Sequence, residues 1–339
     1  MSETIEVLIT IPFDEELANR IRGVSPRLRI TEIKASRPEE IPAETWSKVE
    51  ILYTNRVLPG ADQAPRLRWI QFHWAGLDHV ADHPLLKNPD LAITTLSGAA
   101  ASQMAEYAVM MLLSLGHRLP DLIANQKRGE WPRDRWERFS PIELRDSTVG
   151  IVGYGSIGRQ IARLLQNFGM TVLATKRDTM HPEDSGYTPE GLGDPAGDLV
   201  HRLYPPQALR SMLKECDFLV VTVPLTPDTH LLVKAEELAV MKPTAFIVDI
   251  SRGNVVDHVA LISALRDKKI AGAALDVYPE EPLPPESPLW KLPNVIITPH
   301  ISGNTPHYNE RAVALFTENL LRYLGGLPLY NRYDLQRGY

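Results

Sequence analysis

Three segments of the chain each place a chemically capable side chain directly after a run of apolar residues. Arg252 follows FIVDIS, Glu281 lies in ALDVYPEE, and His300 ends the run NVIITPH. A guanidinium presents a planar fork of donors that suits a carboxylate, and an imidazole can donate or accept a proton near neutral pH. A glutamate that hydrogen-bonds the other ring nitrogen would fix the orientation of that imidazole. Together the three residues predict an acid–base site for an anionic substrate.

Each of these residues also has a plainer interpretation. His300 could cap a strand, and Arg252 could belong to an ordinary turn. Glu281, like its neighbour Glu280, could be a solvated charge. We favour the chemical interpretation because all three follow predicted strands, and ligands of wound sheets bind at the carboxyl ends of strands.

A second motif is a glycine-rich turn between a predicted strand and a predicted helix. Its residues are Gly153, Tyr154, Gly155, Ser156, Ile157 and Gly158. Glycines at this spacing permit a tight turn, close approach of a pyrophosphate to the backbone, and close packing of helix on strand. The helix N-terminus adds N–H groups and a positive potential. The motif predicts dinucleotide binding, with a simple glycine-rich turn as the alternative.

The residues after the next predicted strand bear on which dinucleotide binds. An NAD site usually has an acidic residue about 20 positions past the turn, for the adenosine ribose. Eighteen residues after Gly158 this chain has Lys176, followed by Arg177. Two cations would attract a 2′-phosphate, so we predict that NADP is preferred over NAD. The alternative is a solvated basic pair, with Asp178 binding the ribose.

Short apolar runs alternate with helix-like stretches along most of the chain, which predicts an α/β fold with wound parallel sheets. The predicted strands are Glu6–Ile11, Val49–Tyr53, Trp69–Phe72, Thr148–Val152, Thr171–Ala174, Phe218–Val223, Ala245–Ile250, Ala271–Val277 and Val295–Thr298. Long helices are predicted over 102–117 and 306–324. Between two strands, 178–203 contains four glycines, three prolines and six acidic residues and is predicted to be a long irregular segment, functional or decorative.

Composition limits the class of protein. The 339 residues suffice for two domains, and a formal charge of −6 with interspersed signs does not suit nucleic acid. The ten histidines are scattered, so no metal site is predicted. One cysteine, an acidic N-terminal segment and an apolar stretch interrupted by Gln103 and Glu106 predict a cytoplasmic protein without export signal or membrane span.

At the glycine turn and at Arg252, Glu281 and His300, the sequence closely resembles the D-isomer-specific 2-hydroxyacid dehydrogenases. This family includes glyoxylate/hydroxypyruvate reductases and phosphoglycerate and formate dehydrogenases. The resemblance implies two wound parallel-sheet domains: a Rossmann dinucleotide-binding domain, 102–300, inserted into a discontinuous flavodoxin-like substrate domain, 1–101 and 301–339. It also implies a homodimer and an NAD(P)-dependent interconversion of a small 2-keto acid and its D-2-hydroxy acid.

Within this family interpretation, His300 supplies a proton to the keto oxygen, Glu281 holds the imidazole, and Arg252 binds the substrate carboxylate and keto oxygen. Further residues are implied to line the cofactor: Val223, Pro224, Thr229, Ile250, Ser251, Asp276 and Gly303. In the segment WAGLDHV, the backbone amides of Ala75 and Gly76 are implied to hold the substrate carboxylate. His73 and Trp74 beside them either shape the pocket or pack.

Some features depart from the family pattern and leave alternatives open. Asp146 stands where the family usually has glycine, and the segment 178–203 is longer than expected. The favoured substrates are glyoxylate and hydroxypyruvate. One alternative is a formate or phosphite dehydrogenase, because the three site residues do not set substrate size. Another is a dinucleotide-sensing corepressor on the same scaffold.

Overall fold

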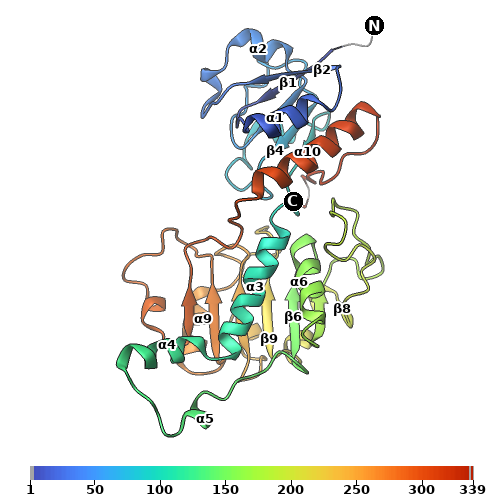
Figure 1. The fold of residues 1–339 in the computed structure, drawn as a ribbon. Coiled ribbons are helices and arrows are strands. Elements are labelled where there is room, and N and C mark those ends of the chain that lie inside the picture. The colour runs from blue at the N-terminus through green and yellow to red at the C-terminus, as the bar shows by residue number, and fades with distance from the viewer. Residues whose placement is uncertain (1–3, 336, 339) are drawn as a thin grey trace. The chain divides into compact units, whose positions relative to one another are not determined.

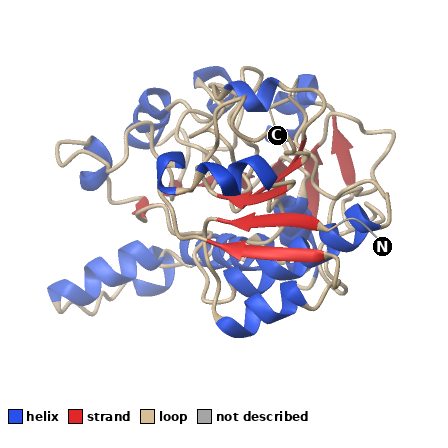
Figure 2. Ribbon diagram, turned by 90° about the horizontal axis from the view of Figure 1, so that it is seen from above, coloured by secondary structure: helices blue, strands red, loops and turns tan. Residues whose placement is uncertain are grey.

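The computed structural model describes residues 4–335 and 337–338, which form two compact units (Figure 1). Unit 1 comprises residues 1–99, 185–187 and 305–339, and unit 2 comprises 100–184 and 188–304. Each unit has its own parallel sheet. Figure 2 shows helices beside the strands. The predicted α/β class with two wound parallel sheets is confirmed.

The sheet of unit 1 has the strand order β2-β1-β3-β4-β5 with parallel pairing throughout. This is the doubly wound order of flavodoxin-like sheets. Its strands are β1 (Ile5–Ile9), β2 (Leu28–Glu32), β3 (Ile51–Thr54), β4 (Trp69–Phe72) and β5 (Ala92–Thr94). Its helices are α1 (Glu15–Arg22), α2 (Ala43–Lys48) and α10 (Tyr308–Leu324), with short 3₁₀ turns at Pro38–Glu40 and Pro84–Lys87.

Two apolar clusters cover the two faces of this sheet. Phe316 of α10 and Ile21 of α1 pack with strand residues such as Val7, while Trp46 of α2 lies in the opposite cluster with Leu8. Neighbouring strand residues therefore enter different clusters, as the alternation of side chains along a strand requires.

The sheet of unit 2 has the order β12-β11-β10-β9-β6-β7-β8 and is also parallel throughout. Its strands are β6 (Thr148–Val152), β7 (Thr171–Thr175), β8 (Arg202–Tyr204), β9 (Phe218–Val221), β10 (Phe246–Asp249), β11 (Gly272–Leu275) and β12 (Val295–Ile297). The order reverses between β6 and β9, where ligands of such sheets bind.

Helices cover both faces of the second sheet. They are α3 (Ala101–Gly116), α4 (Leu119–Arg128), α5 (Arg135–Arg138), α6 (Ser156–Gln166), α7 (Leu209–Leu213), α8 (Ala235–Leu238) and α9 (His258–Arg266), with 3₁₀ turns at Pro206–Ala208 and Pro288–Lys291. Leu112 of α3 and Ile161 of α6 belong to one apolar cluster, and Leu261 of α9 belongs to the other. The two helices α3 and α6 pack directly together (Figure 1).

Nine of the observed strands were predicted, and three were not: β2, β5 and β8. Strand β2 reads LRITE, and its side chains are half-buried or exposed because it lies at a sheet edge. The other two strands have only three residues each. An exposed edge and short length weaken the apolar signal that a buried central strand gives.

Two departures from the family pattern have visible structural counterparts. Asp146 has φ of 62°, in the left-handed region that favours glycine and that aspartate tolerates better than most residues. The segment predicted to be irregular, 178–203, contains no helix or strand from 178 to 201, but its last two residues belong to the short edge strand β8.

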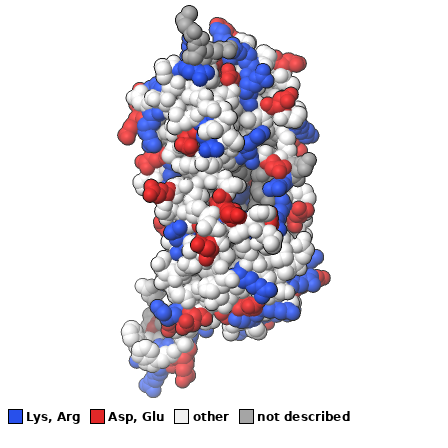
Figure 3. Space-filling view, turned by 90° about the vertical axis from the view of Figure 1, so that its right-hand side faces the viewer, with Lys and Arg blue, Asp and Glu red and all other residues white. Residues whose placement is uncertain are grey.

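The described residues also bear on the expectations drawn from charge, hydropathy and histidine spacing. Basic and acidic side chains are interspersed on the face shown in Figure 3. None of the helices in the described residues is long and apolar enough to cross a membrane. Over the same residues, no three His, Cys, Asp or Glu side chains are grouped so that they could hold a metal ion.

Candidate active site

The three predicted catalytic residues follow three neighbouring strands of unit 2. Arg252 comes after β10, Glu281 after β11 and His300 after β12. These strands pair in parallel, β10 with β11 and β11 with β12. Parallel pairing brings all three following loops to the same edge of the sheet.

His300 and Glu281 form a direct imidazole–carboxylate pair. Nδ1 of His300 lies 2.7 Å from Oε2 of Glu281, and the backbone amide of Tyr278 donates to Oε1 at 3.0 Å. An ionised carboxylate only accepts, so Nδ1 carries the proton of this bond and Nε2 is the second functional nitrogen. Both side chains are more than one-third exposed, His300 at 45% and Glu281 at 37%. The pair is therefore both oriented and accessible.

Asp276 holds the loop that carries His300. Its carboxylate accepts hydrogen bonds from the amides of Ile301 at 2.9 Å and Ser302 at 2.7 Å, and from the Thr298 hydroxyl at 2.7 Å. His300 itself has φ of 53°, a left-handed conformation that a non-glycine residue adopts only when its surroundings impose it. The buried Asp276 thus fixes the backbone on both sides of the imidazole.

Arg252 is tied to the same region by a close backbone contact. A Cβ on the next residue, Gly253, would lie 1.9 Å from the carbonyl carbon and oxygen of Tyr278. Only glycine allows this approach, which places the loop of Arg252 against the loop of Glu281. One guanidinium nitrogen of Arg252 donates to the carbonyl of Ser251 at 2.9 Å.

The glycine turn lies between β6 and α6, at the point where the strand order reverses. Gly153 has φ of 105°, and a Cβ there would lie 2.8 Å from Cγ1 of Val223. At Gly158 a Cβ would lie 2.2 Å from the carbonyl oxygen of Gly153. These two glycines therefore permit the tight turn and the close packing that were predicted from their spacing.

The turn has the features that a dinucleotide diphosphate needs. Gly155 is the N-cap of α6 and has no side chain to offer to the first amides of the helix. A Cβ at Gly155 would meet no atom within 4 Å, so the backbone is open to a close ligand. With eleven residues, α6 is long enough to present a positive N-terminal potential. These residues fit a dinucleotide.

The predicted pair of cations follows β7, and both side chains already have partners. Nζ of Lys176 donates to the backbone carbonyls of His181 and of Glu183, the latter at 3.1 Å. Arg177 forms an ion pair of 3.3 Å with Asp228, on the loop after β9. Burial lowers the pKa of Lys176, and the positive charge of Arg159 lowers it further.

Several residues predicted to line the cofactor have structural contacts of their own. The Ile250 side chain lies in the core of unit 2, and the Ser251 hydroxyl donates to Asp249 at 2.5 Å. The Thr229 hydroxyl donates to the Pro224 carbonyl at 2.6 Å within the loop after β9. Gly303 lies near the start of α3. Their cofactor contacts stay predictions.

The residues implied to bind the substrate carboxylate belong to unit 1. Ala75 and Gly76 follow β4, and Ala75 is exposed. His73 is buried, and its Nδ1 lies 2.7 Å from the Tyr53 hydroxyl. Burial lowers the pKa of His73 to about 4, so the ring is neutral at pH 7. Its contacts with Tyr53 and Trp74 agree with a packing role.

The buried polar residues that the prediction did not include are, among others, Arg159, Asp194 and Asp249. Asp249 ends β10, and its Oδ1 accepts hydrogen bonds from the amide and hydroxyl of Ser251. Its Oδ2 is buried without a hydrogen-bond partner among the described residues. Burial, with a smaller contribution from the charge of Asp276, raises the pKa of Asp249 to about 7. An aspartate at the end of an otherwise apolar run was the available signal.

Comparison with known proteins identifies the family that this architecture resembles. Residues 109–302 match the family profile described as D-isomer specific 2-hydroxyacid dehydrogenase, NAD binding domain. A glyoxylate reductase of Thermococcus gammatolerans is 35% identical over 297 residues, which cover 85% of this chain and 84% of that protein.

Solved structures give the same result over the whole chain. A D-isomer specific 2-hydroxyacid dehydrogenase of Xanthobacter autotrophicus Py2, in complex with NADPH and MES, has a TM-score of 0.78 at 28% identity and full coverage of both chains. An NADPH-dependent glyoxylate/hydroxypyruvate reductase of Sinorhizobium meliloti, in complex with NADP and sulfate, has a TM-score of 0.74 at 27% identity. That match covers 99% of this chain and 100% of the other.

The buried carboxyl of Asp249 should make stability depend on pH. Its pKa of about 7 in the folded protein lies above the ordinary value of 3.8, so the folded state binds more protons than the unfolded state between these values. Its contribution to stability is therefore present below about pH 4 and is lost as the pH rises to about 7. Relative to the wild type, Asp249→Asn should gain on the order of 2 kcal/mol in free energy of unfolding between pH 5 and 8.

Thermal or urea unfolding of both proteins across this pH range measures the difference. Asp198→Asn, at an exposed aspartate of the same unit, is the matched control and should show little pH-dependent change. A difference between Asp249→Asn and wild type that stays constant with pH would contradict a raised pKa at Asp249.

Proposed function

Because the chain belongs to the D-isomer-specific 2-hydroxyacid dehydrogenase family, we propose that this oxidoreductase reduces a small 2-keto acid to the D-2-hydroxy acid with NADPH. Glyoxylate and hydroxypyruvate are the favoured substrates. The observation that carries the proposal is the oriented and accessible His300–Glu281 pair at the same sheet edge as Arg252 and the glycine turn.

In the proposed reaction, His300 provides the proton and Glu281 keeps the imidazole in position. Reduction adds a hydride to the keto carbon and a proton to the keto oxygen; when bound, the reduced nicotinamide supplies the hydride. With Nδ1 bonded to Glu281, the imidazolium can donate its Nε2 proton to the oxygen. In the oxidative direction the neutral ring takes the proton back.

Arg252 is proposed to bind the substrate. A guanidinium forms paired hydrogen bonds to a carboxylate and can also polarise the adjacent keto oxygen. From the family resemblance, the backbone amides of Ala75 and Gly76 in unit 1 are proposed to contact the substrate carboxylate. Binding of this type selects for 2-keto acids in general, while the size of the substrate depends on the rest of the pocket.

Preference for NADPH is proposed from the two cations after β7. Lys176 and Arg177 follow the strand that ends near the adenosine ribose in this fold, and a 2′-phosphate there would meet positive charge. The NADPH and NADP complexes of the Xanthobacter and Sinorhizobium proteins support this assignment. The remaining cofactor contacts are proposed at the residues named from the family pattern, among them Asp276 and Val223. The cytoplasmic location stays a prediction.

A homodimer is proposed through the segment that contains α4 and α5. Trp131 and Trp136 are 85% and 79% exposed, and Leu122 and Ile123 on α4 are partly exposed as well. In Figure 1, α5 lies on a loop that extends away from the sheet of unit 2. Exposed aromatic and aliphatic side chains gathered on one segment are typical of an interface. A second copy of the chain is the proposed partner, in line with the family resemblance.

The function is tested with purified protein and a panel of acids. We expect oxidation of NADPH with glyoxylate or hydroxypyruvate, and a kcat/KM for NADPH at least about tenfold above that for NADH, the effect of one well-placed charged contact. If the protein turns over only formate, phosphite or 3-phosphoglycerate, with the oxidised cofactor, that compound is the substrate in place of glyoxylate or hydroxypyruvate. Cofactor binding without any turnover would favour the corepressor alternative.

The role of His300 is tested by His300→Gln. Loss of the proton donor should lower kcat by at least about 100-fold, while the Kd for NADPH, measured by fluorescence titration, stays within about twofold. His307→Gln is the matched control, because His307 also pairs with a glutamate, Glu310, at 3.0 Å on an exposed surface. Near-normal kcat in His300→Gln would remove this residue from the mechanism.

The dimer is tested by light scattering after size-exclusion chromatography. The wild type should have twice the mass of one chain, and Trp136→Glu should shift the population toward monomer, because a buried unpaired charge destabilises an interface. Leu321→Glu, at a 52% exposed leucine of α10, is the control and should stay dimeric. A monomeric wild type would contradict the proposal.

A further inference from the structure

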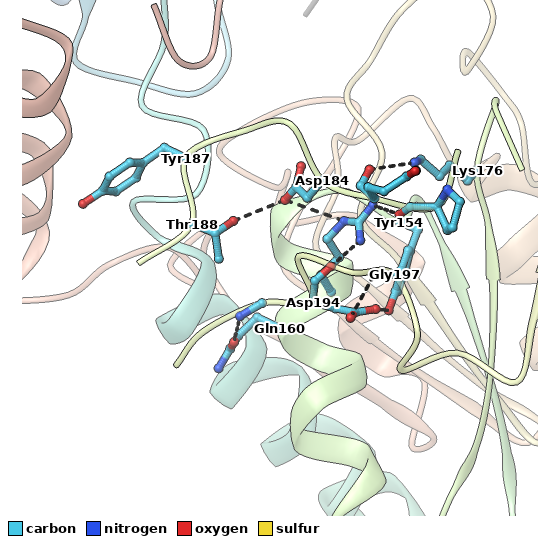
Figure 4. A network of polar contacts seen from close by, with 12 residues as sticks. Tyr154, Gln160, Lys176, Asp184, Tyr187, Thr188, Asp194 and Gly197 are labelled. Atoms are coloured by element: carbon cyan, nitrogen blue, oxygen red, sulfur yellow. Dashed lines mark hydrogen bonds and ion pairs between the residues drawn. The ribbon is translucent and has the colours of Figure 1, made fainter. Parts of the chain in front are cut away.

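The segment between β7 and β8 has no role in the proposed mechanism. Two parts of it belong to unit 2, 178–184 and 188–201; we call residues 178–184 and 188–199 the support segment. It has no helix or strand, but it forms many polar contacts with α6 and with the glycine turn, as Figure 4 shows. This density of specific contacts distinguishes it from a decorative loop.

Asp194 is the centre of these contacts. Its side chain is almost fully buried, with Oδ1 accepting from the amides of Gly197 at 3.0 Å and Asp198 at 3.2 Å. Its Oδ2 accepts from the amide of Leu199 at 3.1 Å and from the hydroxyl of Tyr154 at 2.5 Å (Figure 4). Although burial raises it, the hydrogen bonds bring the pKa of Asp194 below its ordinary value. One carboxylate therefore closes its own loop and connects that loop to the glycine turn.

Arg159, on the first turns of α6, provides a second connection. Its side chain is 1% exposed, and its guanidinium donates to the carbonyls of Asp194 at 2.5 Å and Pro182 at 2.6 Å. Its Nε lies 3.6 Å from Oδ2 of Asp184. A buried guanidinium is costly unless it is bonded, so these contacts fix the backbone of the support segment on the dinucleotide helix.

Glycine at position 197 is required by the same arrangement. Gly197 has φ of 76°, and a Cβ there would lie 2.3 Å from the carbonyl oxygen of Pro182. The two arms of the support segment are thus in direct backbone contact. Asp194, through its loop, holds in place the arm that contains Pro182.

That arm also contacts Lys176. The carbonyls of His181 and Glu183, on either side of Pro182, accept hydrogen bonds from Nζ of Lys176 (Figure 4). An ammonium group has three donors, and carbonyl partners leave its full charge in place. The position of this ammonium is therefore set by the backbone that Asp194 and Arg159 hold.

We propose that the support segment positions Lys176 to bind the 2′-phosphate of NADPH, and that Asp194 is the positioning residue on which this arrangement depends. This inference rests on the proposed preference for NADPH. It gives the support segment a role in the preference for NADPH. If the charges of Lys176 and Arg177 were sufficient by themselves, no such role would be needed. Asp194 acts through Lys176 and does not touch the reacting atoms.

The test compares two aspartates of the same segment, Asp194→Asn and Asp198→Asn. Each change removes one negative charge, so a purely electrostatic effect would tighten NADPH binding in both. Loss of positioning should instead weaken NADPH binding in Asp194→Asn by about tenfold, as expected when a charge-assisted contact is lost. In Asp194→Asn the Kd for NADH, which has no 2′-phosphate, should change clearly less than the Kd for NADPH; equal weakening of both dinucleotides would indicate a disturbed glycine turn, through the bond to Tyr154, and would overturn the inference. In Asp198→Asn the Kd for NADH should change less than about twofold.

Lys176→Met links the effect to the ammonium. This variant should lose NADPH affinity as Asp194→Asn does, and the double variant should lose no more than either single one, because both remove the same contact. Fluorescence titration with NADPH and NADH measures all the affinities without turnover. Additive losses, or a normal preference in either single variant, overturn the inference and leave the proposed function standing.

A wild type that binds NADH as tightly as NADPH overturns the proposed cofactor and this inference together. Should Asp194→Asn not fold, hydrogen exchange of the wild type replaces it. Adenosine 2′,5′-bisphosphate should slow exchange of the Gly197 and Leu199 amides, and 5′-AMP should not; equal effects of the two ligands overturn the inference.

Discussion

The structure of the candidate site depends on the parallel pairing of β10, β11 and β12. The loops that follow parallel strands lie at one edge of the sheet. Arg252, Glu281 and His300, which are 19 to 48 positions apart in the chain, are therefore at the same edge. The strand pairing determines only the approximate position of these loops. The close contact at Gly253 and the carboxylate of Asp276 then fix the loops that carry the side chains.

Much of the site could be predicted because its residues are marked by type and spacing. The glycine turn, the arginine before Gly253 and the histidine after β12 each stand beside an apolar run. The α/β alternation predicts a parallel sheet, whose strands all end at the same edge. The edge strands β2 and β8 were missed because exposed or three-residue strands carry little apolar pattern. Local sequence thus predicted the motifs better than the borders of the sheets.

The contacts of Lys176 could not be predicted from the sequence, for a physical reason. Its partners are the backbone carbonyls of His181 and Glu183, and any residue type could supply them. Arg159 likewise bonds to carbonyls, and Asp194 accepts mainly from amides. Side chains that bind backbone atoms depend on the path of the chain, and that path is fixed only when the whole segment folds.

Two buried aspartates of unit 2 show why burial alone does not determine the state of a carboxyl group. Both oxygens of Asp194 accept hydrogen bonds, and its pKa is lowered. Asp249 has donors at one oxygen, from Ser251, and its other oxygen is without a partner among the described residues. Its pKa is raised to about 7, since burial is opposed by too few donors. The number and placement of donors therefore separate a carboxylate that anchors a segment from one that takes up a proton near neutral pH.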